Sequence, residues 1–201
     1  ITPAQTTQLA AYVLLIEKWN KVHNLTAIRD PLEMVTLHIL DSLSVLKMLV
    51  AQQPKTVLDV GAGAGLPSIP LAICLPDINF TAIDAVQKKA SFMRQAKAEL
   101  GLANFSVEAG RVEQLKKEKF NQGLGFDVIV SRAFSEIALF VKLTQALLAE
   151  NGCWFAMKGV VPHEELEKAE FKKLGILVEN VAPLFVPALD AERHLLVLKV
   201  N

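Results

Sequence analysis

Residues 56–66 of the chain read TVLDVGAGAGL, a short apolar run followed directly by three glycines at alternating positions. The run has the length and the β-branched content of a buried strand. Glycine adopts positive φ readily and lets the backbone approach a ligand closely, so Gly61, Gly63 and Gly65 predict a tight turn after this strand. A helix expected from about Leu66 begins at the same place. Because ligands of open α/β sheets bind beyond the carboxyl ends of the strands, this loop is the first candidate site.

Further apolar runs follow the loop and alternate with helical stretches, notably over 86–100 and 136–149. Strands that alternate with helices pair in parallel through right-handed crossovers. The last two runs are separated by the 182–193 loop, which suits an antiparallel pair at an edge of the sheet. We therefore predict a Rossmann-like α/β fold with a seven-stranded, mostly parallel sheet and an antiparallel edge strand. The predicted strands cover 56–60, 79–84, 105–108, 126–131, 153–158, 177–181 and 194–200.

Two helices are predicted before the sheet. Apolar residues recur at three- and four-residue spacing over 4–20, which is typical of an amphipathic helix. A second helix begins at Asp30, whose side chain can cap it, and Glu33 completes a capping box. We expect residues 1–50 to form a helical extension and residues 51–201 the α/β domain, within one compact unit.

The spacing of the glycines distinguishes a dinucleotide site from a site for S-adenosylmethionine. A dinucleotide fingerprint, Gly-x-Gly-x-x-Gly, would need glycine where Leu66 stands. The acid-x-Gly-x-Gly-x-Gly pattern that begins at Asp59 is instead typical of enzymes that bind S-adenosylmethionine. Asp84 ends the second predicted strand, where a carboxylate can accept hydrogen bonds from ribose hydroxyls, cap the next helix, or do both. Val112 and Glu113 follow the third strand and are placed to border an adenine, although an acid there also opens helices. A turn without a ligand remains the alternative interpretation of the loop.

Motifs spread from about residue 19 to residue 199 occur together in one family. They are NLT at 24–26, RDP at 29–31, HILDS at 38–42, the glycine loop over 59–70, SRAF at 131–134, MKG at 157–159, VPALD at 186–190 and ERHL at 192–195. In this combination the chain resembles the bacterial small-subunit ribosomal RNA methyltransferase G family, also called the glucose-inhibited division protein B family.

The resemblance implies a class I S-adenosylmethionine-dependent methyltransferase that modifies N7 of one guanine in bacterial 16S ribosomal RNA. The residues that it implies as contacts of S-adenosylmethionine are Gly61, Leu66, Val112, Glu113 and Arg132. The chain departs from the family pattern at Ser68, where glycine is frequent, and at Leu37, where a basic residue is frequent. Serine is small enough for a helix start, whereas Leu37 removes one contact to RNA.

Methylation of guanine N7 requires no proton removal, because N7 carries a free lone pair at neutral pH. Such an enzyme can work by positioning and electrostatics alone. The sequence has no Asn-Pro-Pro-Tyr or Asp-Pro-Pro-Tyr motif after the fourth strand, which exocyclic amine methyltransferases would show. Cys74 and Cys153 lie in apolar surroundings, so we predict core thiols rather than nucleophiles or metal ligands.

Arg132 and Lys158 follow the fourth and fifth predicted strands, at the rim where an acceptor base would lie. We predict that Arg132 contacts the donor or orients the guanine, and that Lys158 binds RNA phosphate. The alternatives are a surface ion pair for Arg132 and a solvated strand end for Lys158. Arg29 and Arg193 are further candidates for RNA binding.

Composition limits the class of protein. Hydrophobic residues make up 52% and charged residues 21% of the chain, which is enough for a full core. A net charge of +0 neither supports nor excludes a nucleic-acid partner. No uninterrupted apolar run reaches the roughly 18 residues that span a bilayer, and the start of the chain does not resemble a signal peptide. We expect a monomeric cytoplasmic protein that acts away from the membrane.

Several alternatives stay open at this point. His38 and Asp41 share a helix face, which suits a metal or acid–base pair, but buried hydrogen bonds explain the pair as well, so we expect no metal. The chain could also be a small-molecule methyltransferase, a nicotinamide oxidoreductase or a non-catalytic RNA-binding factor. The sequence does not decide between naked ribosomal RNA and the assembled small subunit as substrate.

Overall fold

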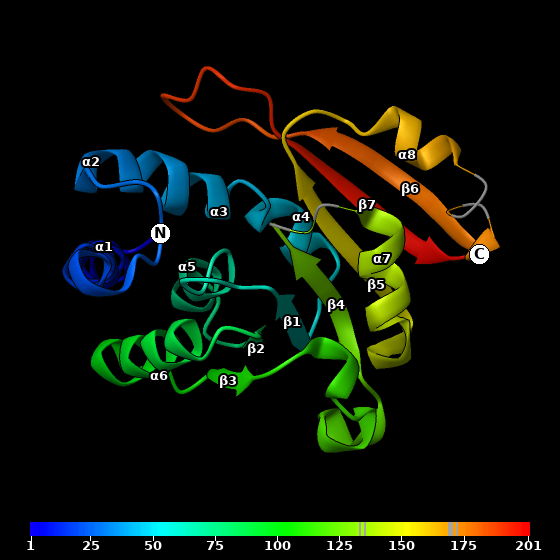
Figure 1. The fold of residues 1–201 in the computed structure, drawn as a ribbon, viewed down its shortest axis with the longest axis horizontal. Coiled ribbons are helices and arrows are strands. Elements are labelled where there is room, and N and C mark those ends of the chain that lie inside the picture. Colours follow the sequence, from blue (N-terminus) through cyan, green and yellow to red (C-terminus); the bar gives the residue numbers. More distant parts are fainter. Residues whose placement is uncertain (133, 135, 169–170, 172) are drawn as a thin grey trace.

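The computed structural model describes residues 1–132, 134, 136–168, 171 and 173–201 (Figure 1). Ala133, within the SRAF motif, lies outside the described residues. The described chain forms a central twisted sheet with helices on both faces, and the N-terminal helices pack at one side.

The sheet has seven strands in the order β3-β2-β1-β4-β5-β7-β6. The strands are β1 (Thr56–Val60), β2 (Asn79–Asp84), β3 (Phe105–Ala109), β4 (Phe126–Ser131), β5 (Leu148–Lys158), β6 (Ile176–Pro183) and β7 (His194–Val200). The first five strands pair in parallel, and β7 pairs antiparallel with both β5 and β6. This confirms the predicted mostly parallel sheet with an antiparallel pair at its edge. The last strand in sequence, β7, lies between β5 and β6, so β6 is the edge strand.

Strand order reverses between β1 and β4. From β1 the chain proceeds outward through β2 to β3, and from β4 it proceeds in the opposite direction to β5. The carboxyl ends of β1 and β4 therefore form the position at which open α/β sheets bind ligands. The glycine loop follows β1 at this position.

β5 begins at Leu148 rather than at Cys153. The missed part carries the polar residues of the sequence ENG at 150–152, which do not read as a strand. The register against β4 shifts here, and a Cβ on Gly152 would lie 2.9 Å from the carbonyl oxygen of Phe126. Close approach of two backbones explains why glycine occupies this part of the strand.

The remaining elements are helices. They are α1 (Pro3–His23), α2 (Pro31–Met34), a π-helical segment (Val35–Leu40), α3 (Asp41–Leu43), α4 (Leu46–Ala51), α5 (Ser68–Cys74), α6 (Gln87–Leu100), α7 (Ile137–Thr144), α8 (His163–Glu167) and short 3₁₀ segments at Val112–Gln114, Lys117–Lys119, Asn121–Gly123 and Gln145–Leu147. The two predicted N-terminal helices are confirmed, although the second is divided into segments. Asp30 caps α2 through the amide of Leu32 at 3.0 Å. Among the described contacts, however, the capping box forms between Thr2 and Gln5 of α1 and not at Glu33.

Alternate side chains of β1 enter two hydrophobic clusters, one on each face of the sheet. Val57 joins the cluster that contains α5, α6 and the N-terminal helices, whereas Leu58 and Val60 join the cluster under α7. In the first cluster, the rings of Tyr12 and Phe92 lie 6.4 Å apart between α1 and α6. The N-terminal helices thus share a core with the sheet.

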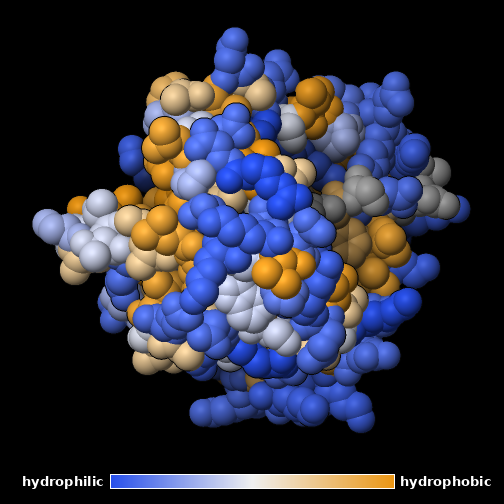
Figure 2. Space-filling model, turned by 60° about the vertical axis from the view of Figure 1, so that its left-hand side comes forward, coloured by the Kyte–Doolittle hydropathy of each residue, from blue (hydrophilic) through white to orange (hydrophobic). Residues whose placement is uncertain are grey.

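The segment Pro31–Ala51 is long and apolar enough to cross a membrane by length and composition alone. Glu33, Asp41 and Lys47 interrupt the apolar run within it. Its buried residues include Met34, Ile39, Val45 and Leu49, which belong to the same core cluster as α5 and α6. Packing inside the protein therefore accounts for part of its apolar composition, since 39% of the most apolar 18-residue window is buried. Figure 2 shows the side with α1 and α6, where hydrophilic residues cover most of the face and hydrophobic residues form small separate patches.

Candidate active site

The glycine loop has the backbone conformation that its sequence predicts. Gly61, Gly63 and Gly65 have φ angles of +70°, +62° and +87°. A Cβ on Gly65 would lie 2.4 Å from Cδ1 of Ile69, whereas a Cβ on Gly61 would enter open space. Gly65 is therefore required for packing as well as for φ, and Gly61 leaves the front of the loop open.

Two acids fix the loop from different sides. Asp84 accepts hydrogen bonds from the amides of Gly63 at 2.8 Å and Val86 at 2.8 Å, so it holds the loop and caps the segment that leads into α6. Asp59 is fully buried, and its Oδ2 accepts from the amide of Ser68 at 3.1 Å, at the start of α5. Burial raises the pKa of Asp59 to about 6, and hydrogen bonding from Ser68 opposes this rise.

A cavity of about 260 Å³ opens beside the loop, and we name it the Asp84 cavity. Its wall combines apolar side chains with the carboxylates of Asp84 and Glu113. Gly61 and Val112 also line it, so four of the predicted cofactor-binding residues meet here. Apolar walls suit a purine ring, and carboxylates suit ribose hydroxyls.

A second cavity of about 460 Å³ lies beyond the ends of β4 and β5, and we name it the Asp41 cavity. Arg132, Lys158 and Arg193 line it together with Asp41. Arg132, Lys158 and Arg193, three of the four residues predicted to face the acceptor or RNA, thus come together from distant parts of the chain, in a cavity that one carboxylate also lines.

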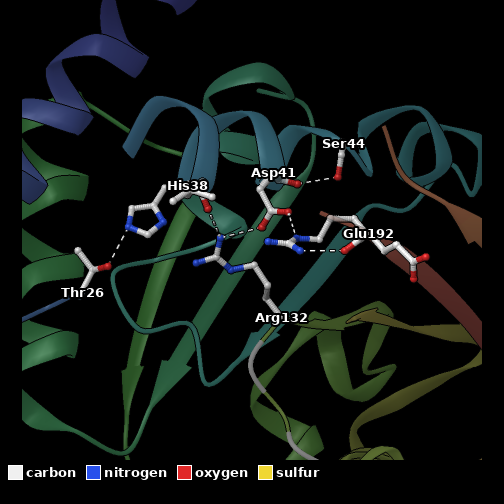
Figure 3. Close-up of polar contacts among 8 residues, drawn as sticks. Thr26, His38, Asp41, Ser44, Arg132 and Glu192 are labelled. Carbon is white, nitrogen blue, oxygen red and sulfur yellow. Dashed lines mark hydrogen bonds and ion pairs between the residues drawn. The ribbon is translucent and has the colours of Figure 1, made fainter. Parts of the chain in front are cut away.

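Asp41 binds the two arginines of this cavity (Figure 3). Its Oδ2 lies 3.0 Å from NH1 of Arg132, and its Oδ1 lies 2.9 Å from Nε of Arg193. Its side chain is only 5% exposed. NH1 of Arg132 also donates to the backbone carbonyl of Leu37 at 3.1 Å. Leu37 therefore contacts Arg132 through its backbone, although its side chain is not basic.

His38 lies beside Asp41 but faces away from it in Figure 3, toward Thr26. Its Nε2 lies 2.9 Å from the hydroxyl of Thr26, and its Nδ1 is buried without a partner among the described residues. Burial lowers the pKa of His38, and the nearby charge of Arg132 lowers it further. The described residues contain no cluster of three or more His, Cys, Asp or Glu side chains suited to a metal.

A hydrogen bond between Lys158 and Phe134 connects the walls of the two cavities. Nζ of Lys158 donates to the carbonyl of Phe134 at 2.7 Å, and Phe134 itself lines the Asp84 cavity. Burial lowers the pKa of Lys158, and Glu165 opposes this shift. The hydroxyl of Ser131, the last residue of β4, donates at 2.9 Å to the carbonyl of Val60, which lines the Asp84 cavity.

Other predicted site residues lie outside both cavities. Leu66 is buried in the core beside the loop. Arg29 is exposed, and its guanidinium donates to the carbonyl of Asn20 at 3.1 Å and to the side chain of Asn24 at 2.8 Å. Arg29 therefore ties the end of α1 to the following loop, and its contact with RNA stays a prediction. Arg132 lines the Asp41 cavity and not the Asp84 cavity, so its contact with the donor also stays a prediction.

Sequence reasoning missed Asp41 as the partner of both arginines. The available signal was an acid within an apolar helix, which requires a buried cation or donors. The two free cysteines fit the predicted core thiols, since Cys153 is buried and Cys74 is half-buried. Burial raises the pKa of Cys153 to about 12, so this thiol is a poor nucleophile.

A sequence profile of the family described as rRNA small subunit methyltransferase G matches residues 5–196. The Ribosomal RNA small subunit methyltransferase G of Methylobacillus flagellatus is 59% identical over 197 residues, which cover 98% of this chain and 90% of the relative. The protein of the same name from Aromatoleum aromaticum is 49% identical over 205 residues, which cover 100% of this chain and 92% of the relative.

Solved structures support the fold. A 1,6-didemethyltoxoflavin-N1-methyltransferase from Burkholderia thailandensis, crystallised with S-adenosylhomocysteine, has a TM-score of 0.63 at 14% identity and covers 95% of this chain and 88% of its own. A SAM-dependent methyltransferase from Aquifex aeolicus has a TM-score of 0.59 at 20% identity and covers 86% and 99%. At such identities the likeness establishes a class I methyltransferase fold. The profile and the sequence relatives go further: the chain belongs to the rRNA small subunit methyltransferase G family.

Proposed function

We propose that this chain transfers a methyl group from S-adenosylmethionine to N7 of a specific guanine in bacterial 16S ribosomal RNA. The observation that carries the proposal is a pair of cavities on either side of the point where strand order reverses, whose linings are linked by the hydrogen bond from Lys158 to Phe134. One is largely apolar with two carboxylates and Arg111, which pairs with Glu113, and the other carries three cations. A donor and an anionic acceptor would thereby meet across the ends of β1 and β4.

The residues of the Asp84 cavity fit an adenosyl ligand. A Cβ on Gly61 would meet no atom within 4 Å, so the space beside this residue is open, and Val112 offers an apolar surface for a purine. Asp84 and Glu113 would accept hydrogen bonds from ribose and adenine. Leu66 and Asp59 would act from behind the loop by fixing its path into α5. S-adenosylmethionine, when bound, supplies a methyl group on a sulfonium, which is already activated for in-line displacement at carbon.

The Asp41 cavity would receive the acceptor. Each guanidinium has five N–H donors, of which Asp41 and neighbouring carbonyls occupy only some, so the remainder could bind O6 of guanine or a phosphate while N7 stays free to attack. Lys158 would bind phosphate near the rim. RNA binding that depends on such contacts should weaken steeply as the salt concentration rises.

The proposed reaction uses no general base. Guanine N7 needs none, and the groups near the acceptor side have other partners: His38 contacts Thr26, and Asp41 is paired with two arginines. The residues would hold donor and acceptor in line, and a positioned pair gains much of the rate that a bimolecular reaction lacks. Both cavities are formed by one chain, so we propose a monomeric enzyme that acts in the bacterial cytoplasm.

The proposal is tested by mapping N7-methylguanine in 16S ribosomal RNA from cells that lack this protein and from cells that regain it. We expect one modified guanine to disappear and return. The purified Arg132→Ala variant should methylate ribosomal RNA about 100-fold more slowly than the parent although it is folded. Unchanged modification in all strains would exclude the proposed acceptor. As a control, the reaction is repeated with purified protein, which shows that no other methyltransferase in the cell restores the modification.

A further inference from the structure

Tyr12 of α1 contacts the glycine loop directly. Its hydroxyl donates to the carbonyl oxygen of Ala64 at 2.5 Å, across 52 positions of the chain. Both residues are buried, and the tyrosine side chain has 0% exposure. A residue of the N-terminal helices therefore reaches the middle of the loop that lines the Asp84 cavity.

The bond ties the loop to α1, in addition to the turn within the loop, where the amides of Gly65 and Leu66 donate to the carbonyl of Ala62 at 2.8 and 2.9 Å. Ala64 stands between Gly63 and Gly65, which both have positive φ and little conformational preference. The amides of Gly61 and Ala62 are fixed by the carbonyl of Ile83 at 2.9 and 3.1 Å, on the β2 side. Tyr12 fixes the opposite side, so the loop is held between β2 and α1.

Tyr12 is well suited to remain a donor. Its ring packs against Phe92 within the core, and this packing fixes the position of the hydroxyl. Burial raises the pKa of Tyr12 well above its usual value, while Arg132 lowers it and Asp59 raises it. The hydroxyl therefore keeps its proton at neutral pH.

We propose that Tyr12 is a positioning residue for the methyl donor, so that α1 completes the cofactor site. The inference rests on the proposed function only for the identity of the donor. It assigns the N-terminal helices a part in binding S-adenosylmethionine, beyond any contact with RNA.

The first test compares Tyr12→Phe with Gln8→Met by calorimetric titration with S-adenosylmethionine in the absence of RNA. The side chain of Gln8 also joins α1 to a carbonyl, that of Leu100 at 3.1 Å, but away from the loop. We expect Tyr12→Phe to raise Kd about tenfold, the effect of one lost hydrogen bond, and Gln8→Met to leave it within about twofold. Equal affinity in Tyr12→Phe and the parent would overturn the proposal, and so would an equal loss in both variants.

A second measurement does not depend on the stability of a variant. Tyr12 is the single tyrosine of the chain, so biosynthetic 3-fluorotyrosine labels this position alone. We expect its ¹⁹F resonance to shift when S-adenosylhomocysteine saturates the protein. A resonance that does not move at saturation would overturn the proposal. Neither measurement contains RNA, so an error in the acceptor would leave both results unchanged.

Discussion

Oδ1 of Asp41 lies 2.9 Å from Nε of Arg193, across 152 positions of the chain. The same carboxylate binds Arg132, which lies 91 positions away. One acid in the N-terminal helical region thereby holds cations that follow β4 and precede β7. Removing one partner of a buried ion pair leaves an uncompensated charge, so substitution of Asp41 should lower both activity and the free energy of unfolding.

Asp41→Asn should lower methyl transfer strongly. The amide keeps one oxygen, so at most one arginine retains its acceptor, and the other guanidinium loses its orientation. We expect kcat for ribosomal RNA to fall at least about tenfold and the free energy of unfolding to fall by about 1–3 kcal/mol. The Kd for S-adenosylmethionine should stay within about threefold. Methyl incorporation, urea unfolding and calorimetry provide the three values.

Glu179→Gln is the matched control for Asp41→Asn. Glu179 of β6 pairs with Lys199 of β7 at 2.7 Å, and both side chains are more than a third exposed. An exposed pair contributes little, so this variant should keep both kcat and stability. If Asp41→Asn behaves like Glu179→Gln, Asp41 does not position the arginines for catalysis.

Gly61→Ala and Gly65→Ala should separate binding from folding. Both substitutions strain a backbone with positive φ, which costs about 1 kcal/mol. At Gly65 the new methyl group also meets Ile69, so we expect a further loss of stability. At Gly61 the methyl group enters open space beside the Asp84 cavity. We therefore expect the loss of binding free energy for S-adenosylmethionine to exceed the loss of free energy of unfolding. Calorimetry and thermal unfolding of both variants check this difference, and a stable Gly65→Ala protein would contradict the packing argument.

The fold could be predicted because its main signals are local. The β1 run, the three glycines and the alternation of strands with helices all lie within short windows of sequence. Gly61, Asp84, Val112 and Glu113 were predicted from their places after β1, β2 and β3, and the structure brings them to one cavity. Parallel strands make this step reliable, since their carboxyl ends lie at the same edge.

The contacts of Asp41 and Tyr12 could not be predicted in the same way. Each joins the N-terminal helices to residues far along the chain, and no local pattern specifies how those helices dock on the sheet. The start of β5 was missed for a different reason, because close backbone approach at Gly152 replaces the apolar pattern of a strand. Tertiary packing overrides local preference at both places.

Arg132→Ala and Arg132→Lys should distinguish the two roles proposed for Arg132. The guanidinium lies in the Asp41 cavity, so we expect Arg132→Ala to reduce kcat about 100-fold, as the loss of one oriented donor does elsewhere. Lysine keeps the charge but not the planar fork, so its kcat should be intermediate. The Kd for S-adenosylmethionine should change by less than about threefold in both. A large rise in Kd with little change in kcat would assign Arg132 to the donor instead.

Asp59→Asn should change how stability depends on pH. Burial raises the pKa of Asp59 from 3.8 to about 6, so the folded protein favours the protonated carboxyl more than the unfolded chain does. The stabilising contribution of this group is therefore complete below about pH 4 and is lost as pH rises to about 6. The shift corresponds to as much as about 3 kcal/mol. Asparagine does not ionise and keeps an oxygen that can accept from the amide of Ser68. We measure the free energy of unfolding of both proteins by urea titration from pH 4 to pH 8. The value for the variant minus the value for the parent should increase up to about pH 6 and stay constant above it. A difference between the two proteins that is constant over the whole range would show that Asp59 titrates alike in the folded and unfolded states.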